Sequence, residues 1–375
     1  MGALATKFGE KCGLVRFGGL SRKARAGWSV FRRPLVTRAL PIHMHIEPTS
    51  KCNLECPMCL RKEVFGNGRN MDFETFRKIY LQIRPLHITL NGQGEPMMNR
   101  DLWQMIEFSE GRGTRVNLTS NGNFLHRFYG EVIDSGLTLL SVSLDSVDPE
   151  VYRVVRSRDL LEETLRGLAL LRDEKARRGV TRPAVRLSSV MMEKTIDGGR
   201  AFLDRAKELG AESVLFQPMA LFGKWSNASL VGKYQDRETY HQALVDLDRH
   251  AREAGVPTNL QQVIRDFEIV AQLYDRGKDP TNALSKGCLF PWFSLYIRSD
   301  GEVMACCVRS YARQSLGNVL REDIRKIWNN EKYLAVRRIF REGKSLPYPE
   351  CVGCAPPRLT ELAEKMKYTP RFMRS

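Results

Sequence analysis

The sequence predicts a mixed α/β fold with a parallel sheet, and two observations support this. Strand-like segments alternate with helical segments over residues 42–217, which gives about six strand-then-helix units. Such alternation is typical of parallel sheets with right-handed crossovers, either curled or flat. Runs of Cys, Gly, Asn, Ser or Asp also follow four successive predicted strands. In a curled β/α barrel the chemistry sits at the carboxyl ends of the strands, so these runs mark a functional edge.

Each element is predicted from its local pattern. Alternating or continuous apolar runs predict strands over residues 43–48, 86–91, 115–119, 139–144, 184–192 and 213–217. Helical periodicity predicts helices over residues 72–83, 102–110, 124–135, 160–178, 199–209 and 239–254. The C-terminal part differs in kind. Residues 293–298 and 302–308 flank Asp300-Gly301 and predict a hairpin, and residues 323–342 predict one basic amphipathic helix.

Composition and charge limit the class of protein. The chain has 375 residues, 42% of them hydrophobic, and 59 Lys and Arg against 43 Asp and Glu give a net charge of +16. This composition is typical of a globular protein. The sequence has no run of about 18 apolar residues, the length that a transmembrane helix needs. The N-terminus lacks the apolar block of a secretory signal. We therefore expect a cytoplasmic protein, peripheral to a membrane at most, in which thiols stay reduced.

Eight of the nine cysteines form two groups, and their clustering predicts two metal sites, whereas Cys12 has no partner in the sequence. Three are spaced Cx3Cx2C and could ligate three irons of a [4Fe–4S] cluster, which leaves the fourth iron open for a ligand. The alternative is zinc, completed by His43 or His45 just upstream. The first group is Cys52, Cys56 and Cys59, and the second is Cys288, Cys306, Cys307, Cys351 and Cys354.

The first cysteine loop resembles the CxxxCxΦC motif of radical S-adenosylmethionine (radical SAM) enzymes, with Met58 at the Φ position. Residues 92–96 resemble the GGEP motif, with Gln93 in place of the second glycine, and residues 119–122 and 143–145 resemble the family's T-N-G turn and S-x-D strand end. The resemblance implies a partial (β/α)6 TIM-like barrel whose first cluster is held by the three cysteines. It also implies S-adenosylmethionine contacts at Met58, Gly92, Gln93, Gly94, Glu95, Pro96, Asn121, Ser143, Asp145 and Arg156.

The second cysteine group resembles a SPASM or twitch extension, a β-hairpin plus helix that carries auxiliary iron–sulfur clusters. Its layout is most similar to those of 2-deoxy-scyllo-inosamine dehydrogenases and anaerobic sulfatase maturases. Four cysteines at matching positions imply one auxiliary [4Fe–4S] cluster, with Cys307 a bystander or substitute ligand. The alternative is a zinc ribbon. The matching cysteines are Cys288, Cys306, Cys351 and Cys354.

These patterns divide the chain into five predicted parts. Residues 1–41 are a basic arm with interleaved apolar residues, which we expect either to lie on a membrane surface or to pack across the barrel. Residues 42–220 are the radical SAM core and residues 221–285 a helical connection. Residues 286–357 are the auxiliary-cluster domain, and residues 358–375 a C-terminal tail.

The resemblance implies the reaction type. The first cluster, reduced by a partner such as flavodoxin or ferredoxin, would cleave S-adenosylmethionine, and the resulting 5′-deoxyadenosyl radical would abstract a hydrogen atom from the substrate. The auxiliary cluster would either accept the second electron or ligate the substrate. With the first of these roles we expect an oxidoreductase acting on a small molecule. The alternatives are a peptide or protein maturase with the same cofactors, and a zinc-stapled nucleic-acid-binding protein.

Catalytic and substrate-binding residues are weakly indicated. Glu193 and Glu302 are candidate bases, although solvated surface carboxylates are the simpler interpretation. Late-strand residues that could face a barrel lumen are candidate substrate contacts or plain barrel packing. These are Ser188, Val190, Gln217 and Met219.

Overall fold

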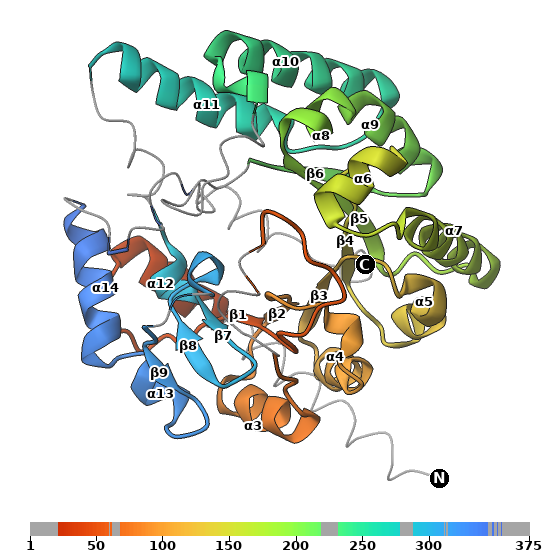
Figure 1. Cartoon of the computed structure of the whole chain (residues 1–375). Helices are drawn as coiled ribbons and strands as arrows, with labels where there is room; N and C mark the ends of the chain where they lie inside the picture. Colours follow the sequence, from red (N-terminus) through yellow and green to blue (C-terminus); the bar gives the residue numbers. More distant parts are fainter. Residues whose placement is uncertain are drawn as a thin grey trace, which may run out of the picture.

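The computed structural model describes residues 22–59, 61, 68–218, 232–277, 288–310, 312, 314–343, 347–348, 351 and 354. Within these residues the strands form one nine-stranded sheet in the order β6-β5-β4-β3-β2-β1-β7-β8-β9, with helices packed along it (Figure 1). Strands β1 to β6 pair in parallel in chain order, which confirms the predicted α/β fold. The six strands are β1 (His43–Ile46), β2 (His87–Leu90), β3 (Arg115–Ser120), β4 (Leu139–Ser143), β5 (Ala184–Met191) and β6 (Ser213–Pro218).

Helices connect these strands close to the predicted positions. The sequence patterns did not predict two short helices, which are α6 between β4 and the long helix that follows, and α8 after β5. The two long helices after β6 pack on each other, and the second of them lies in a stretch predicted only as a helical connection. The helices are α3 (Phe73–Ile83), α4 (Leu102–Glu110), α5 (Leu125–Asp134), α6 (Pro149–Arg156), α7 (Leu161–Arg178), α8 (Glu193–Asp197), α9 (Gly199–Glu208), α10 (Arg237–Ala254) and α11 (Leu260–Asp275).

Alternation along the strands separates two faces of the sheet. In β1, Met44 and Ile46 are fully buried in the same apolar core as Phe76 and Ile79 of α3. The alternate residues of the strands point to the opposite face, which we call the inner face, and most of them are half-buried. The core therefore lies between sheet and helices.

The C-terminal segment extends the sheet beyond β1. Strand β7 (Ser294–Ile297) follows α12 (Phe290–Phe293) and pairs in parallel with β1. Strands β8 (Glu302–Met304) and β9 (Gly317–Asn318) continue antiparallel, so the predicted hairpin is present. The parallel pairing of β7 with β1 joins the two cysteine-bearing parts of the chain through one set of backbone hydrogen bonds.

The prediction of one helix over residues 323–342 is wrong, because two helices occupy that range, α13 (Ile324–Ile327) and α14 (Glu331–Glu342). The buried Trp328 donates its indole N–H to the Ala39 carbonyl at 2.9 Å. Asn330 then caps α14 by accepting a hydrogen bond from the Tyr333 amide. The tryptophan anchor and the new cap interrupt the helix.

Residues 22–32 form a helix, and Arg22 donates to the Ile83 carbonyl at the end of α3 at 2.9 Å. The segment that follows is held by the C-terminal helices, since Trp292 donates to the Pro34 carbonyl at 2.9 Å and Arg337 to the Leu35 carbonyl at 3.0 Å. Residues 1–21, Met219 and the predicted tail lie outside the described residues. Within the described part, no helix has the length and apolar character needed to cross a bilayer.

Candidate active site

The first cysteine loop follows β1 and is tied to the loops after β2 and β3. The Glu95 amide donates to the Lys51 carbonyl at 2.7 Å. Asn53 accepts a hydrogen bond from Asn121 at 2.8 Å and donates to Asn123 at 3.0 Å. Three of the motifs quoted from the sequence therefore meet at one edge of the sheet, as their order along the strands predicted.

The two glycines of residues 92–96 are required because the chain there passes very close to the segment that follows β1. A Cβ on Gly92 would lie 2.4 Å from Glu47 Cγ, and one on Gly94 would lie 2.3 Å from the Thr49 carbonyl oxygen. Only glycine fits at either position without displacing the first loop. Gln93, between them, has room for a side chain, which explains why the GGEP pattern tolerates its replacement here.

Glu95 is fully engaged by the protein. Its buried carboxylate accepts hydrogen bonds from the Asn121 amide at 2.6 Å, Ser120 Oγ at 2.8 Å and the Met97 amide at 3.0 Å. Pro96 follows at the start of the short 3-10 helix η1 (Pro96–Met98). The side chain of this predicted cofactor contact thus joins the β2 and β3 loops, and the backbone around it is what faces the site.

Two further predicted cofactor contacts pair with each other. Asp145 Oδ2 and Arg156 Nη2 are 2.6 Å apart and both side chains are buried. The Val190 amide donates to the other Asp145 oxygen at 2.8 Å. Arg156 also reaches the first cysteine loop, with Nη1 4.0 Å from Cys56 Sγ, and its buried Nε has no hydrogen-bond partner within the described residues. A cationic group thus stands directly beside a predicted cluster ligand.

The remaining predicted contacts surround the same edge. Ser143 Oγ accepts from Ser188 Oγ at 3.4 Å on the inner face. Met58 is half-buried in the cysteine loop, and Val190 is half-buried while Gln217 is exposed. These positions remain predictions for cofactor or substrate contact.

The first three cysteines do not form a mononuclear site with a histidine. His43 hydrogen-bonds Thr89 and Ser294, both at 2.9 Å, and His45 hydrogen-bonds Asn91 at 3.2 Å. Within the described residues, no three His, Cys, Asp or Glu side chains converge closely enough for a single ion. Burial raises the pKa of Cys52 to about 11, so a thiolate there needs a bound metal.

The second cysteine group lines one pocket. Cys288, Cys306, Cys351 and Cys354 are part of its lining together with apolar side chains, while Cys307 packs instead against Tyr296 and Met304. Burial raises the pKa values of Cys288 and Cys354 to about 12. Four thiols that are costly to ionise in apolar surroundings fit a fully ligated cluster. None of the described cysteines forms a disulfide.

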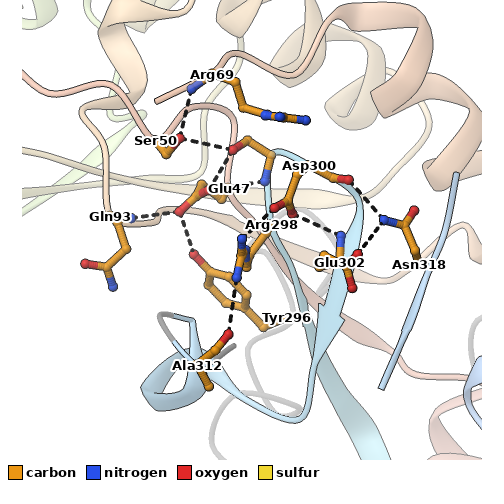
Figure 2. Close-up of polar contacts among 11 residues, drawn as sticks. Glu47, Ser50, Arg69, Gln93, Tyr296, Arg298, Asp300, Glu302, Ala312 and Asn318 are labelled. Carbon is orange, nitrogen blue, oxygen red and sulfur yellow. Dashed lines mark hydrogen bonds and ion pairs between the residues drawn. The ribbon is translucent and has the colours of Figure 1, made fainter. Parts of the chain in front are cut away.

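The two candidate bases have other partners. Glu302 accepts a hydrogen bond from Asn318 at 2.9 Å and stays within the C-terminal hairpin, as Figure 2 shows. Glu193 begins α8 and accepts from the Lys233 amide at 3.2 Å. Both half-buried carboxylates hold loops in place, and a role as base stays a prediction for either.

Sequence reasoning missed Glu47, which follows β1 and is completely buried (Figure 2). One carboxylate oxygen accepts from the Gln93 amide at 3.0 Å and Tyr296 Oη at 3.3 Å. The other accepts from the Ser299 amide at 3.2 Å and Ser299 Oγ at 2.7 Å. The only signal was its alternation with His43 and His45, which places it at the inner-face end of β1. Glu47 joins the β2 loop to the C-terminal segment.

Gln93 makes a second connection between the two cysteine-bearing parts. Its Nε2 donates to Ser310 Oγ at 2.7 Å, while its Oε1 lies 3.8 Å from Cys59 Sγ. The residue that departs from the GGEP pattern therefore bridges the first cysteine loop and the segment just after Cys306 and Cys307.

Family comparison agrees with this geometry. The model of the radical SAM superfamily matches residues 46–186. The chain belongs to this superfamily. A second model, SPASM, an iron–sulfur cluster-binding domain, matches residues 288–355. The protein is thus a radical SAM enzyme, and its two domains imply [4Fe–4S] clusters and S-adenosylmethionine as cofactors.

Relatives of this radical SAM enzyme are similar over part of their length. The GTP 3′,8-cyclase of Staphylococcus carnosus (strain TM300) is 29% identical over 134 residues, which are 32% of this chain and 39% of that protein. The chain spans 39 to 57% of the length of the curated relatives it matches.

Solved structures share the fold at low identity. Streptococcus suis SuiB bound to S-adenosylmethionine is 15% identical with a TM-score of 0.61, covering 80% of this chain and 68% of its own. Native anSMEcpe with bound AdoMet and the Cp18Cys peptide is 17% identical with a TM-score of 0.57, covering 87% of this chain and 95% of its own. These likenesses show that the chain shares the fold of these proteins over most of its length.

Proposed function

We propose that this radical SAM enzyme is an oxidoreductase that oxidises a small-molecule substrate, with one auxiliary cluster as the electron acceptor. Cys52, Cys56 and Cys59 would hold the first cluster. The four cysteines of the C-terminal pocket would hold the auxiliary one. When bound, the first cluster and S-adenosylmethionine supply reductive cleavage and hydrogen-atom abstraction.

One observation supports an electron-accepting role for the auxiliary site. Phe290 lines the four-cysteine pocket and also stacks on His45, with ring centroids 5.7 Å apart. His45 belongs to the inner face of β1. Only the Phe290 ring therefore lies between the auxiliary pocket and His45 on the inner face, where a barrel enzyme would bind its substrate. This separation is short enough for electron transfer.

The chain's own residues would orient the cofactor. The two glycines let the β2 loop backbone approach the first cysteine loop, and Glu95 fixes the spacing of the β2 and β3 loops. The Asp145–Arg156 pair places a guanidinium at Cys56 without leaving an unpaired buried charge. These groups fix the site before the cofactor arrives, which favours a preorganised geometry.

The first experiment is to measure iron, sulfide and zinc per chain after anaerobic reconstitution. About eight irons with matching sulfide would support two [4Fe–4S] clusters. About four irons would remove the electron acceptor and overturn the oxidation. Zinc without iron would instead favour the nucleic-acid-binding alternative.

A peptide or protein maturase is the second candidate, because SuiB has been solved with its precursor peptide SuiA in a structure covering 85% of this chain. The two candidates share both clusters. Screening for substrate-dependent consumption of S-adenosylmethionine with small-molecule and peptide fractions separates them. A flavodoxin or ferredoxin is the proposed reductant in either case.

We also propose that the N-terminal helix contacts a membrane surface. Its apolar side chains Trp28 and Phe31 are 63% and 76% exposed, Val36 just beyond the helix is 62% exposed, and Arg32 lies over the Trp28 ring at 5.4 Å. Exposed aromatic residues flanked by cations suit an anionic lipid surface. Co-sedimentation with anionic vesicles should fall in a W28A/F31A variant, and equal sedimentation of both proteins would contradict the contact.

A further inference from the structure

The inner face of the barrel strands carries cationic and ionisable basic side chains without any acidic one. Over β1 to β6 the residues that alternate with the core positions include two arginines and three histidines, and neither Asp nor Glu occurs among them. The acids at this face, Glu47 and Asp145, lie beyond the strand ends and have partners of their own. The basic residues are His43, His45, His87, Arg115 and Arg186.

Four of these five side chains lie next to one another. His43, His87 and Arg115 occupy one row of paired positions across β1, β2 and β3. The rings of His43 and His87 stack at 4.8 Å, and His45 meets His43 edge-on at 4.4 Å. Hydroxyls hold His43 at both nitrogens, which fixes its ring in place.

Arg186, on β5, is the side chain that points most directly to a ligand. Its Nε donates to Ser141 Oγ at 3.2 Å, and within the described residues this is its one hydrogen bond and no carboxylate pairs with it. Burial lowers the pKa of its guanidinium, with no nearby charge to oppose the effect. A neutral hydroxyl does not offset the cost of desolvating a cation.

Two buried arginines of this protein, Arg156 and Arg337, have stronger partners than the half-buried Arg186. Arg156 has Asp145 at 2.6 Å. Arg337 donates to three oxygens, those of Pro291, Leu35 and Asn329, and lies over the Trp328 ring at 4.5 Å. Arg186 differs from these two, since the described residues supply no hydrogen bond to its two terminal nitrogens, which are left for a ligand.

We propose that Arg186 binds an anionic group of the substrate, a phosphate or a carboxylate, on the inner face, with the basic row at β1 to β3 favouring the same charge. A guanidinium presents a planar pair of donors that matches either group. Ser141, which pairs with Arg186, precedes Asp145 by four residues, so the anion would sit about 13 Å along the strand from the predicted cofactor edge. The substrate class is then an anionic metabolite long enough to span that distance.

This inference rests on the proposed function only for the assumption that the inner face binds the substrate, and it can be tested without turnover. Titration calorimetry on the anaerobically reconstituted holoprotein would use pyrophosphate, inorganic phosphate and succinate at constant ionic strength. We expect the preferred anion to bind about tenfold more weakly to R186Q and several-fold more weakly to R186K. Preference for the phosphates or for succinate identifies the anionic group.

Arg182→Gln is the matched control, because Arg182 lies just before the same strand, is 53% exposed and pairs with Glu110. It should bind the anions as the wild type does. Equal affinity of R186Q and wild type, or an equal loss in R182Q, would overturn the proposal. Amide hydrogen exchange of β5 tests the proposal on the wild-type protein without any variant. If adding pyrophosphate or succinate leaves the protection of β5 amides unchanged, the proposed role of Arg186 is also overturned. Iron content and S-adenosylmethionine cleavage, measured on the same samples, report separately on the proposed function.

Discussion

Arg156 and Asp145 form a buried ion pair, 2.6 Å from Nη2 to Oδ2, directly beside the Cys56 thiol. Asp145 adopts a positive φ of 64°, an uncommon backbone conformation for a residue other than glycine. The pair holds that turn after β4 against α6 and the first cysteine loop. The arrangement links the stability of the barrel edge to the position of a predicted cluster ligand.

Replacing Arg156 with Ala should strongly destabilise the protein, because it leaves the Asp145 carboxylate buried and unpaired. We expect a loss of about 3–5 kcal/mol in the free energy of unfolding, measured by urea denaturation. Arg153→Ala is the matched control on the same helix, since its pair with Glu150 is exposed. Wild-type stability of R156A would contradict a structural role for the pair.

Gly94→Ala should disturb the junction between the β2 loop and the first cysteine loop. The added Cβ would lie 2.3 Å from the Thr49 carbonyl oxygen, so one loop must move. We expect lower iron retention and weaker S-adenosylmethionine binding in equilibrium dialysis. Gly130→Ala in α5 is the control, because its Cβ would meet open space, and it should raise stability by about 0.5–1 kcal/mol. Normal iron retention and S-adenosylmethionine binding in G94A would count against the close approach.

Glu47→Gln tests the connection between β1 and the C-terminal segment. The carboxylate accepts hydrogen bonds from Gln93, Tyr296 and Ser299, whereas an amide would turn its own N–H groups toward some of these donors. We expect a loss of about 1–3 kcal/mol in urea denaturation. Glu302→Gln should lose less, because among the described residues the Glu302 side chain accepts a hydrogen bond from Asn318 only. A larger loss in E302Q than in E47Q would refute this account.

The two cysteine groups should differ in their effect on chemistry. Cys56→Ala should abolish formation of 5′-deoxyadenosine, while Cys351→Ala should retain it but uncouple it from substrate oxidation. Cys307→Ala should keep the full iron content, because Cys307 packs against Tyr296 and does not line the four-cysteine pocket. Wild-type 5′-deoxyadenosine formation in C56A would refute the assignment of the first site.

Local patterns predicted the strand-helix alternation because they depend on neighbours two to four residues apart. The predicted strands from residue 43 to residue 217 and the hairpin around Gly301 are therefore present. The single helix predicted over residues 323–342 failed because periodicity does not register the burial of Trp328 against Ala39, 289 residues away in the chain. Glu193 and Glu302 were singled out by position alone, and their hydrogen bonds to loops could not be read from sequence.

The sequence by itself determined the α/β class, the two cysteine groups and the glycines that allow the loops to approach. Those features are set by residue type and short spacing. Only the tertiary structure placed β7 beside β1, paired Asp145 with Arg156 and brought Gln93 between Cys59 and Ser310. It also left Arg186 on the inner face with a single hydroxyl partner among the described residues. These contacts join segments that are far apart in the sequence. They depend on strand order and side-chain packing in the folded sheet, which local sequence patterns do not determine.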